Sequence, residues 1–295
     1  MIDTTDRLHP LETSENGRVV TLRPDLSKGK DAWYLLSADW HWDNPKCDRD
    51  LLKKHLDQAK ERNAGVLVFG DLFCLMQGKY DGRRMKGDVR PEHNNATYID
   101  SVIDTFAEWI EPYKANMALV TYGNHETSIL KHLETDVLQR MSAQTKIPLG
   151  KYDGWVRIVP SIIPQNGNNP KNGYVTNIYY HHGSGSGGGI VTKGVIQTNR
   201  RNSYIDGADI MVSGHIHEAW LMETPKESIT SHGTIERKAV MHVQTGTYKE
   251  EFTGSGWHVE RGAPPKPLGS WWLRMYWDRV DEVKRYRYEF IRTEQ

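Results

Sequence analysis

The chain has 295 residues, and its 38 basic and 38 acidic side chains give a formal net charge of zero. This balance gives no global electrostatic reason to bind nucleic acid or an acidic membrane surface, although a local basic patch would suffice for nucleic acid. Two cysteines, Cys47 and Cys74, are too few for a disulfide scaffold or a four-cysteine zinc site, and the first residues lack the apolar core of a signal peptide, so we expect a cytoplasmic protein without a membrane partner.

The first half of the chain alternates between apolar runs and amphipathic stretches. Residues 1–30 are polar and turn-rich, with one strand-like piece at 18–22, and we interpret them as an N-terminal arm. Two helices are expected, one capped by Asp48 and the other with an apolar stripe that ends at Ile110. Three apolar runs predict buried strands, namely AWYLL from Ala32, GVLVFGD from Gly65 and ANMALVTYGNHE from Ala115. This alternation predicts parallel strands joined by crossover helices.

After residue 150 the pattern changes to strands. Strands are predicted at 154–160, 173–182, 208–213 and 238–246. Near the end of the chain, SWWLRMYW and YRYEF each place aromatic or apolar residues at alternate positions, which predicts a closing antiparallel β-hairpin. We therefore expect a single α/β domain over residues 31–295, following the arm over residues 1–30.

Polar side chains that bind metals follow the predicted core strands, at the point where each strand ends. They are Asp39 and His41, then Asp71, then Asn124 and His125, then His181 and His182, and finally His215 and His217. In open α/β sheets the ligand site lies outside the carboxyl ends of the strands, so we expect these side chains to converge. Carboxylate and imidazole without thiolate suit divalent zinc, manganese or iron, and so many ligands suit two ions better than one. Asp71 is the natural bridge, because one carboxylate offers two oxygens.

The motifs DWH, GD, GNHE, HH and GHIH, in this order, resemble those of the calcineurin-like metallophosphoesterase family. The resemblance covers residues 39–217 and implies a two-sheet α/β/β/α sandwich, with the metal site at the carboxyl ends of the core strands and the C-terminal strands in the second sheet. It implies one ion on Asp39, His41, Asp71 and His217. It implies a second ion on Asp71, Asn124, His215 and one histidine of the 181–182 pair, with a slight preference for His181.

The same resemblance implies a hydrolase of phosphate esters, foremost a phosphodiesterase, with a hydroxide on the two metals as the nucleophile. His125 would protonate or stabilise the leaving oxygen, and Asp71 would be essential. The two divalent ions would be manganese, zinc, iron, nickel or magnesium, with manganese expected to work in vitro. Cys74 stands where many relatives carry Asp or Asn, which puts the orientation of the site in question.

Two alternatives stay open at this point. The spellings GDLF, GNHE and GHIHE are similar to the DNA-repair nuclease branch of the family, so a compact DNA exonuclease or endonuclease is one alternative. The GNHE spelling is also shared with protein serine/threonine phosphatases. A non-catalytic metal-binding interaction module is the other alternative. The partner is a phosphate-ester substrate, with nucleotides and DNA among the candidates, and the oligomeric state is left open.

Several features outside the motifs have a structural and a functional interpretation. The charged loop 74–93 is either solvated surface or a lid whose basic side chains meet substrate phosphate. The DGRRMKGDVR stretch of this loop holds Arg83, Arg84, Lys86 and Arg90, and Arg200 and Arg201 raise the same question. GSGSGGG at 183–189 is weak as a dinucleotide loop and more typical of a mobile loop beside the site. Trp40 and Trp42 are core residues or, alternatively, platforms for a base.

Overall fold

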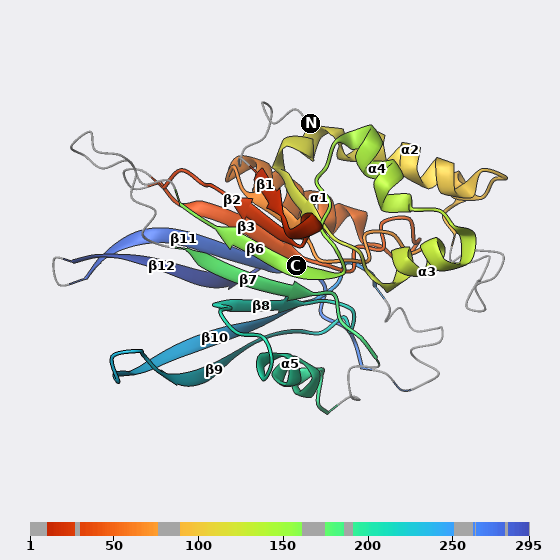
Figure 1. Cartoon of the computed structure of the whole chain (residues 1–295). Coiled ribbons are helices and arrows are strands. Elements are labelled where there is room, and N and C mark those ends of the chain that lie inside the picture. Colours follow the sequence, from red (N-terminus) through yellow and green to blue (C-terminus); the bar gives the residue numbers. More distant parts are fainter. Residues whose placement is uncertain are drawn as a thin grey trace.

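Two β-sheets face each other and form the centre of the molecule (Figure 1). The computed structural model describes residues 11–26, 30–75, 89–160, 175–185, 191–250, 262, 264–280 and 283–294. One sheet has five strands in the order β12-β11-β3-β4-β5, and the other has seven in the order β1-β2-β6-β7-β8-β10-β9. The predicted two-sheet α/β class is confirmed.

The five-stranded sheet contains the alternating first half of the chain. Its parallel strands are β3 (Ala32–Ser37), β4 (Gly65–Val68) and β5 (Met117–Val120). The connecting helices are α1 (Arg49–Glu61) and α2 (Tyr98–Ile110), and Asp48 caps α1 by accepting the amide of Leu51 at 2.8 Å. The parallel strands and crossover helices that the alternation predicted are therefore present.

The C-terminal hairpin belongs to this first sheet. Its strands are β11 (Trp271–Val280) and β12 (Val283–Arg292), which pair antiparallel as predicted. Strand β11 also pairs antiparallel with β3, so that Trp272 lies opposite Leu35. The expectation that the C-terminal strands lie in the second sheet is thus wrong for the hairpin, because the backbone of β11 pairs with the edge of β3.

The seven-stranded sheet contains most of the remaining strands. These are β1 (Leu11–Ser14), β2 (Val19–Leu22), β6 (Asp153–Ile158), β7 (Thr176–His181), β8 (Ile210–Ser213), β9 (Ala219–Ile229) and β10 (Ile235–Thr245). Strands β1 and β2 come from the segment interpreted as an arm, and β2 pairs parallel with β6. This segment is therefore part of the sandwich, while the limits of the domain stay a prediction.

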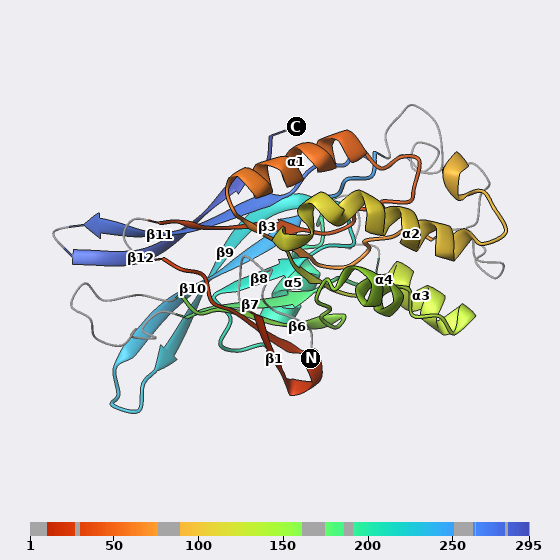
Figure 2. The same cartoon turned by 90° about the horizontal axis from the view of Figure 1, so that it is seen from above.

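The layers follow from the alternation of side chains along the strands. One set of apolar side chains, including Leu36, Leu67 and Ile178, fills the space between the sheets. The opposite face of the first sheet packs against α1, α2 and the later helices α3 (Asn124–Leu133) and α4 (Val137–Thr145), as the view from above shows (Figure 2). On the outer face of the second sheet lies α5 (Val195–Asn202). The order of layers is α/β/β/α, as predicted.

Five elements were not predicted from the sequence, namely β1, α3, α4, α5 and β9. Short 3-10 helices also occur at Glu15–Gly17, Pro91–His93 and Glu111–Asn116. Among the described residues, no helix combines the length and the apolar composition that a membrane span needs.

Candidate metal centre

The candidate residues lie at or just after the carboxyl ends of strands, and the two sheets bring these ends together. Asp39 and His41 follow β3, and Asp71 follows β4. Asn124 and His125 begin α3, four and five residues after β5 ends. His181 is the last residue of β7 and is followed by His182, and His215 and His217 follow β8.

The backbone of these loops is strained at the candidate ligands. Positive φ values occur at Asp39 (53°), His41 (46°), Asp71 (52°), His215 (75°) and His217 (54°). Residues other than glycine seldom adopt this region, and each such residue costs about 1–3 kcal/mol unless its surroundings impose it. The surroundings here include the amide of His215, which donates to Asp39 Oδ2 at 2.7 Å, and the amide of Asp39, which donates to Gly70 at 3.0 Å. Such strain is typical of functional sites.

Two glycines allow the loops to approach closely. A Cβ atom on Gly214 would lie 2.6 Å from Asp39 Oδ2, and one on Gly123 would overlap the carboxylate and amide of Asp71. Both glycines directly precede candidate ligands in the sequence. The glycine in SGHIH and the glycine in GNHE are therefore required because another loop packs against their backbones.

Asp39, His41 and His217 form the first group of possible ligands, called here the Asp39 group. Their donor atoms all lie within 4.8 Å of one another, and all three side chains are buried. His41 Nε2 is 3.1 Å from His217 Nε2, and Asp39 Oδ1 is 3.4 Å from His217 Nε2. Asp39 Oδ1 accepts no hydrogen bond from the part of the chain that the structure describes. A buried carboxylate oxygen facing two imidazoles is a donor set that suits a divalent ion.

Asp71, His182 and His215 form the second group, the Asp71 group, with Asn124 in its midst. Asp71 Oδ2 is 3.2 Å from His182 Nε2. Asn124 Oδ1 is 3.1 Å from His182 Nε2 and 2.7 Å from His215 Nδ1. The other nitrogens of both rings donate to backbone carbonyls, His182 Nδ1 to Phe69 at 2.8 Å and His215 Nε2 to Gly185 at 2.7 Å. Metal-binding histidines are usually oriented by such a second hydrogen bond, so this group fits a metal as well.

Of the neighbouring histidines 181 and 182, only His182 enters the Asp71 group. His181 Nδ1 instead accepts the amide of Gly183 at 3.0 Å, and its ring packs against Tyr152. The reason is the alternation along β7, because Ile178 and Tyr180 face the space between the sheets and His182 continues that face. The structure thus goes against our slight preference for His181. Counting alternate positions from Ile178 would have indicated His182.

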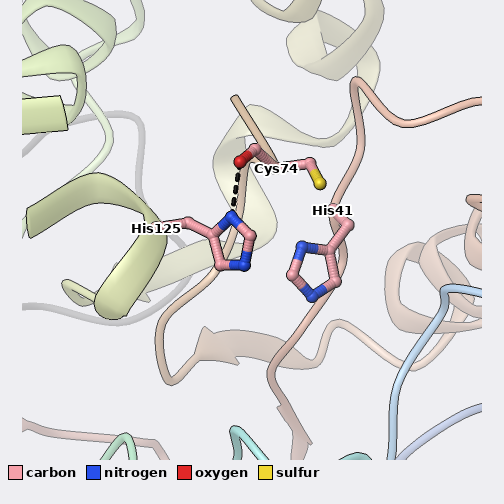
Figure 3. A group of neighbouring side chains, drawn as sticks. All are labelled: His41, Cys74 and His125. Carbon is pink, nitrogen blue, oxygen red and sulfur yellow. Dashed lines mark hydrogen bonds between the residues drawn. The ribbon is translucent and has the colours of Figure 1, made fainter. Parts of the chain in front are cut away.

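His125 lies beside both groups without belonging to either. Its Nδ1 donates to the carbonyl of Cys74 at 2.5 Å (Figure 3). Its Nε2 is 3.9 Å from Asp71 Oδ2. Its ring centroid is 4.9 Å from that of His41. The backbone carbonyl at position 74 therefore orients the His125 ring in this chain, whatever side chain position 74 carries.

Two buried carboxylates that hold the loops in place are outside the sequence prediction of the site. Glu126 accepts the amides of Asp71, Phe73 and Gly123 at 3.2, 3.0 and 2.9 Å. Asp43 accepts the amides of Cys74 and Leu75 at 2.5 and 2.9 Å and the hydroxyl of Tyr98 at 2.9 Å. The density of acidic residues in DWHWD was the only sequence signal for Asp43.

The charges of the site are strongly coupled. Burial opposes ionisation of Asp71, but the adjacent His182 and then His125 hold the pKa of its carboxyl well below the ordinary value. Burial likewise opposes protonation of His182, yet the Asp71 carboxylate raises the pKa of His182 to about 9. For His41, burial and then the nearby His125 lower the pKa well below the ordinary value. His41 is therefore neutral at pH 7, the form in which imidazole binds a metal.

Most of the basic and aromatic candidates do not reach this site. Arg90 donates to the carbonyls of Asn44 and Cys47 at 3.0 and 2.9 Å, so it is bound to the backbone. Arg201 is buried and donates to Ser213 at 3.0 Å, whereas Arg200 is exposed. The base-stacking interpretation of Trp40 and Trp42 is wrong, because both rings are fully buried in the core. Arg83, Arg84, Lys86 and most of the 183–189 segment lie outside the described residues.

No family model matches the sequence, and no curated protein matches it either. Among solved structures, vacuolar protein sorting 29 from Cryptosporidium parvum is 14% identical, with a TM-score of 0.34 over 90% of this chain and 99% of that one. A predicted phosphoesterase from Streptococcus pneumoniae is 10% identical, with a TM-score of 0.28 over 90% of each chain. A hypothetical protein from Thermus thermophilus is 10% identical, with a TM-score of 0.24 over 90% of this chain and all of that one. Likenesses this weak carry no weight for function.

Proposed function

We propose that this chain is a metal-dependent phosphoesterase that hydrolyses phosphodiesters and a distant member of the calcineurin-like metallophosphoesterases. The observation that carries the proposal is the meeting of the Asp39 group and the Asp71 group at one edge of the sandwich, with His125 beside them. Two neighbouring sets of carboxylate and imidazole donors are the usual framework for a pair of divalent ions. Such a pair supplies Lewis acidity, which neutralises charge on phosphoryl oxygens and favours ionisation of a water molecule.

The residues of this chain have three distinct roles in the proposal. The Asp39 group would hold one ion, and the Asp71 group with Asn124 would hold the other. Asp71 has one oxygen near His182, while its Oδ1 accepts the amide of His125 at 3.0 Å. We assign Asp71 to the bridge because it lies near His182 of its own group and near His125, whose ring neighbours His41 of the Asp39 group. Glu126 fixes the loop of Asp71, since the same carboxylate accepts the amides on both sides of Leu72.

His125 is the residue that we assign to the leaving group. Its Nδ1 must carry a proton, because the carbonyl of Cys74 can only accept a hydrogen bond. Its Nε2 therefore carries a proton only in the imidazolium form, and in that form it can donate to a departing oxygen.

A comparison of two aspartate variants tests the proposal. Asp71→Asn removes the charge between the groups, and Asp50→Asn removes an exposed charge on α1 as a matched control. We expect the purified chain to bind two divalent ions and to hydrolyse bis(4-nitrophenyl) phosphate with added manganese. Asp71→Asn should lose at least one ion and most of the turnover. Asp50→Asn should keep both ions and the wild-type turnover.

The outcomes separate the alternatives. Two bound ions without turnover on any monoester, diester, nucleotide or DNA would favour the non-catalytic module. Turnover that survives thorough chelation, or an Asp71→Asn variant as active as Asp50→Asn, would overturn the proposed site.

A further inference from the structure

Cys74 lies beside two of the site's histidines and forms a third group of donors with them. Figure 3 shows the sulfur of Cys74 above the ring of His41, with the ring of His125 beside them. One donor atom from each residue lies within 4.8 Å of the other two. The thiol and His41 are both almost fully buried. This set, called the Cys74 group, has a sulfur donor, unlike the Asp39 and Asp71 groups.

His41 has two ring nitrogens in two different surroundings. Its Nε2 faces His217 at 3.1 Å and so points toward the Asp39 group. Its Nδ1 is buried and has no hydrogen-bond partner among the residues that the structure describes. In Figure 3 this side of the ring faces Cys74 and His125. Leaving a buried polar atom without a partner is unfavourable, so Nδ1 is an unused ligand position directed at the other two members of the Cys74 group.

The other two members are held in place by neighbours that leave their donor atoms available. Asn44 Nδ2 donates to Cys74 Sγ at 3.2 Å, whereas burial raises the pKa of the thiol, so the thiolate forms only together with a bound cation. The hydrogen bond from His125 Nδ1 to the Cys74 carbonyl leaves Nε2 as the free nitrogen of that ring. A thiolate and two neutral imidazoles favour soft or borderline cations such as zinc and cadmium over manganese and magnesium.

We propose that His41 Nδ1, Cys74 Sγ and His125 Nε2 form a further binding site for one soft divalent cation, which shares His41 with the Asp39 group, with zinc as the reference ion. Binding displaces the thiol proton to solvent, forms the metal–sulfur bond and moves the remaining proton of His41 to Nε2. That tautomer cannot ligate an ion in the Asp39 group, so the two sites compete for His41. The binding of zinc is independent of the proposed function. Its consequence rests on that function: excess zinc occupies His41 and His125 and thereby inhibits phosphoester hydrolysis.

Cobalt spectroscopy tests the binding without any activity measurement. A thiolate ligand gives cobalt a charge-transfer band in the near ultraviolet, so we expect this band when cobalt is added to the metal-free chain. Cys74→Ser should abolish it. Cys47→Ser is the matched control, because Cys47 is also a buried thiol and belongs to none of the three groups. A band that survives in Cys74→Ser, or no band in the wild-type chain, would overturn the proposal.

A second measurement needs no variant and therefore does not depend on folding of Cys74→Ser. X-ray absorption of the wild-type chain with excess zinc should show one sulfur neighbour at about 2.3 Å per zinc in this site. Nitrogen and oxygen neighbours alone would overturn the proposal.

Inhibition tests the consequence separately. Excess zinc should inhibit manganese-supported hydrolysis in Cys47→Ser, and Cys74→Ser should need at least about tenfold more zinc for the same fractional inhibition of its own rate. Equal sensitivity of the two variants would overturn the inhibitory role. If no variant hydrolyses any ester, the proposed function fails, while the cobalt band and the sulfur neighbour still decide whether Cys74 binds metal.

Discussion

Replacing His182 by alanine, with His181→Ala as its neighbour control, is the sharpest test of the Asp71 group. The His182 ring is fully buried, and it connects the carbonyl of Phe69 with the carboxylate of Asp71. The pKa of His182 is raised to about 9, compared with the ordinary value of about 6.5. A difference of this size corresponds to about 3 kcal/mol of stabilisation at low pH.

The sign of the effect follows from this raised pKa. In the metal-free chain, the stabilisation by His182 is fully present below pH about 6.5 and is lost as the pH rises through about 9. His182→Ala should therefore lower the free energy of unfolding by about 3 kcal/mol at pH 6 and by less at pH 9. His181→Ala should cost only about 1 kcal/mol, because it removes one hydrogen bond to the amide of Gly183.

Urea denaturation with chelator at both pH values measures these differences, and metal analysis measures the second effect. His182→Ala should weaken the binding of one ion by more than the roughly 10–100-fold expected for loss of an outer partner, whereas His181→Ala should keep both ions. Circular dichroism checks that both variants fold. If both variants lose the ion equally, or His181→Ala alone loses it, His182 is not the ligand and our reasoning from the geometry is wrong.

Three further predictions concern His125, His242 and the charged loop. His125→Ala should keep both ions by metal analysis but lose about 10²–10⁴-fold in turnover of alkyl diesters, and less with 4-nitrophenyl leaving groups; an equal loss for both would indicate phosphate positioning instead. Burial and then Lys226 lower the pKa of His242 to about 4, so protonation of the unfolded chain should destabilise the protein as the pH falls from about 6.5 to 4. Urea titrations should show that the free energy of unfolding decreases less over this pH range in His242→Gln than in the wild-type chain. An equal decrease would exclude His242 as the source of the pH dependence. Neutralising the basic residues of the loop should raise KM for single-stranded DNA and flatten its salt dependence, while a small aryl diester responds little; no response with DNA would remove this support for a nuclease. The residues to replace are Arg83, Arg84 and Lys86.

The sequence predicted the parts of the fold in which burial and periodicity agree. Strands β3, β4 and β5 consist of apolar side chains on both faces because helices cover one face and the second sheet covers the other. Strand β9 was missed because it is an edge strand with Pro225 inside it and many exposed positions. Helix α5 was missed because its eight residues are mostly polar and contribute only Thr198 and Arg201 to the interior.

The sequence indicated which residues belong to the site, but it did not indicate which of their side chains contact one another. The order of the motifs placed Asp39, Asp71 and His215 at strand ends, where the structure also places them. The contact of Cys74 with two histidines depends on how two loops pack, and Asp43 fixes that packing by accepting the amides of Cys74 and Leu75. Sequence spacing contains no information on such contacts between loops.

Asp39 has a consequence for how the protein folds. Asp39 forms hydrogen bonds with Gly70, with His215 at a separation of 176 residues, and with Thr247 at a separation of 208 residues. Contacts between such distant segments form late, because each must first overcome the entropy of closing a long loop. The donor groups therefore exist only after both sheets have docked, and an ion has little to bind in the unfolded chain. Added metal should then raise the melting temperature of the whole chain with concentration and slow its unfolding.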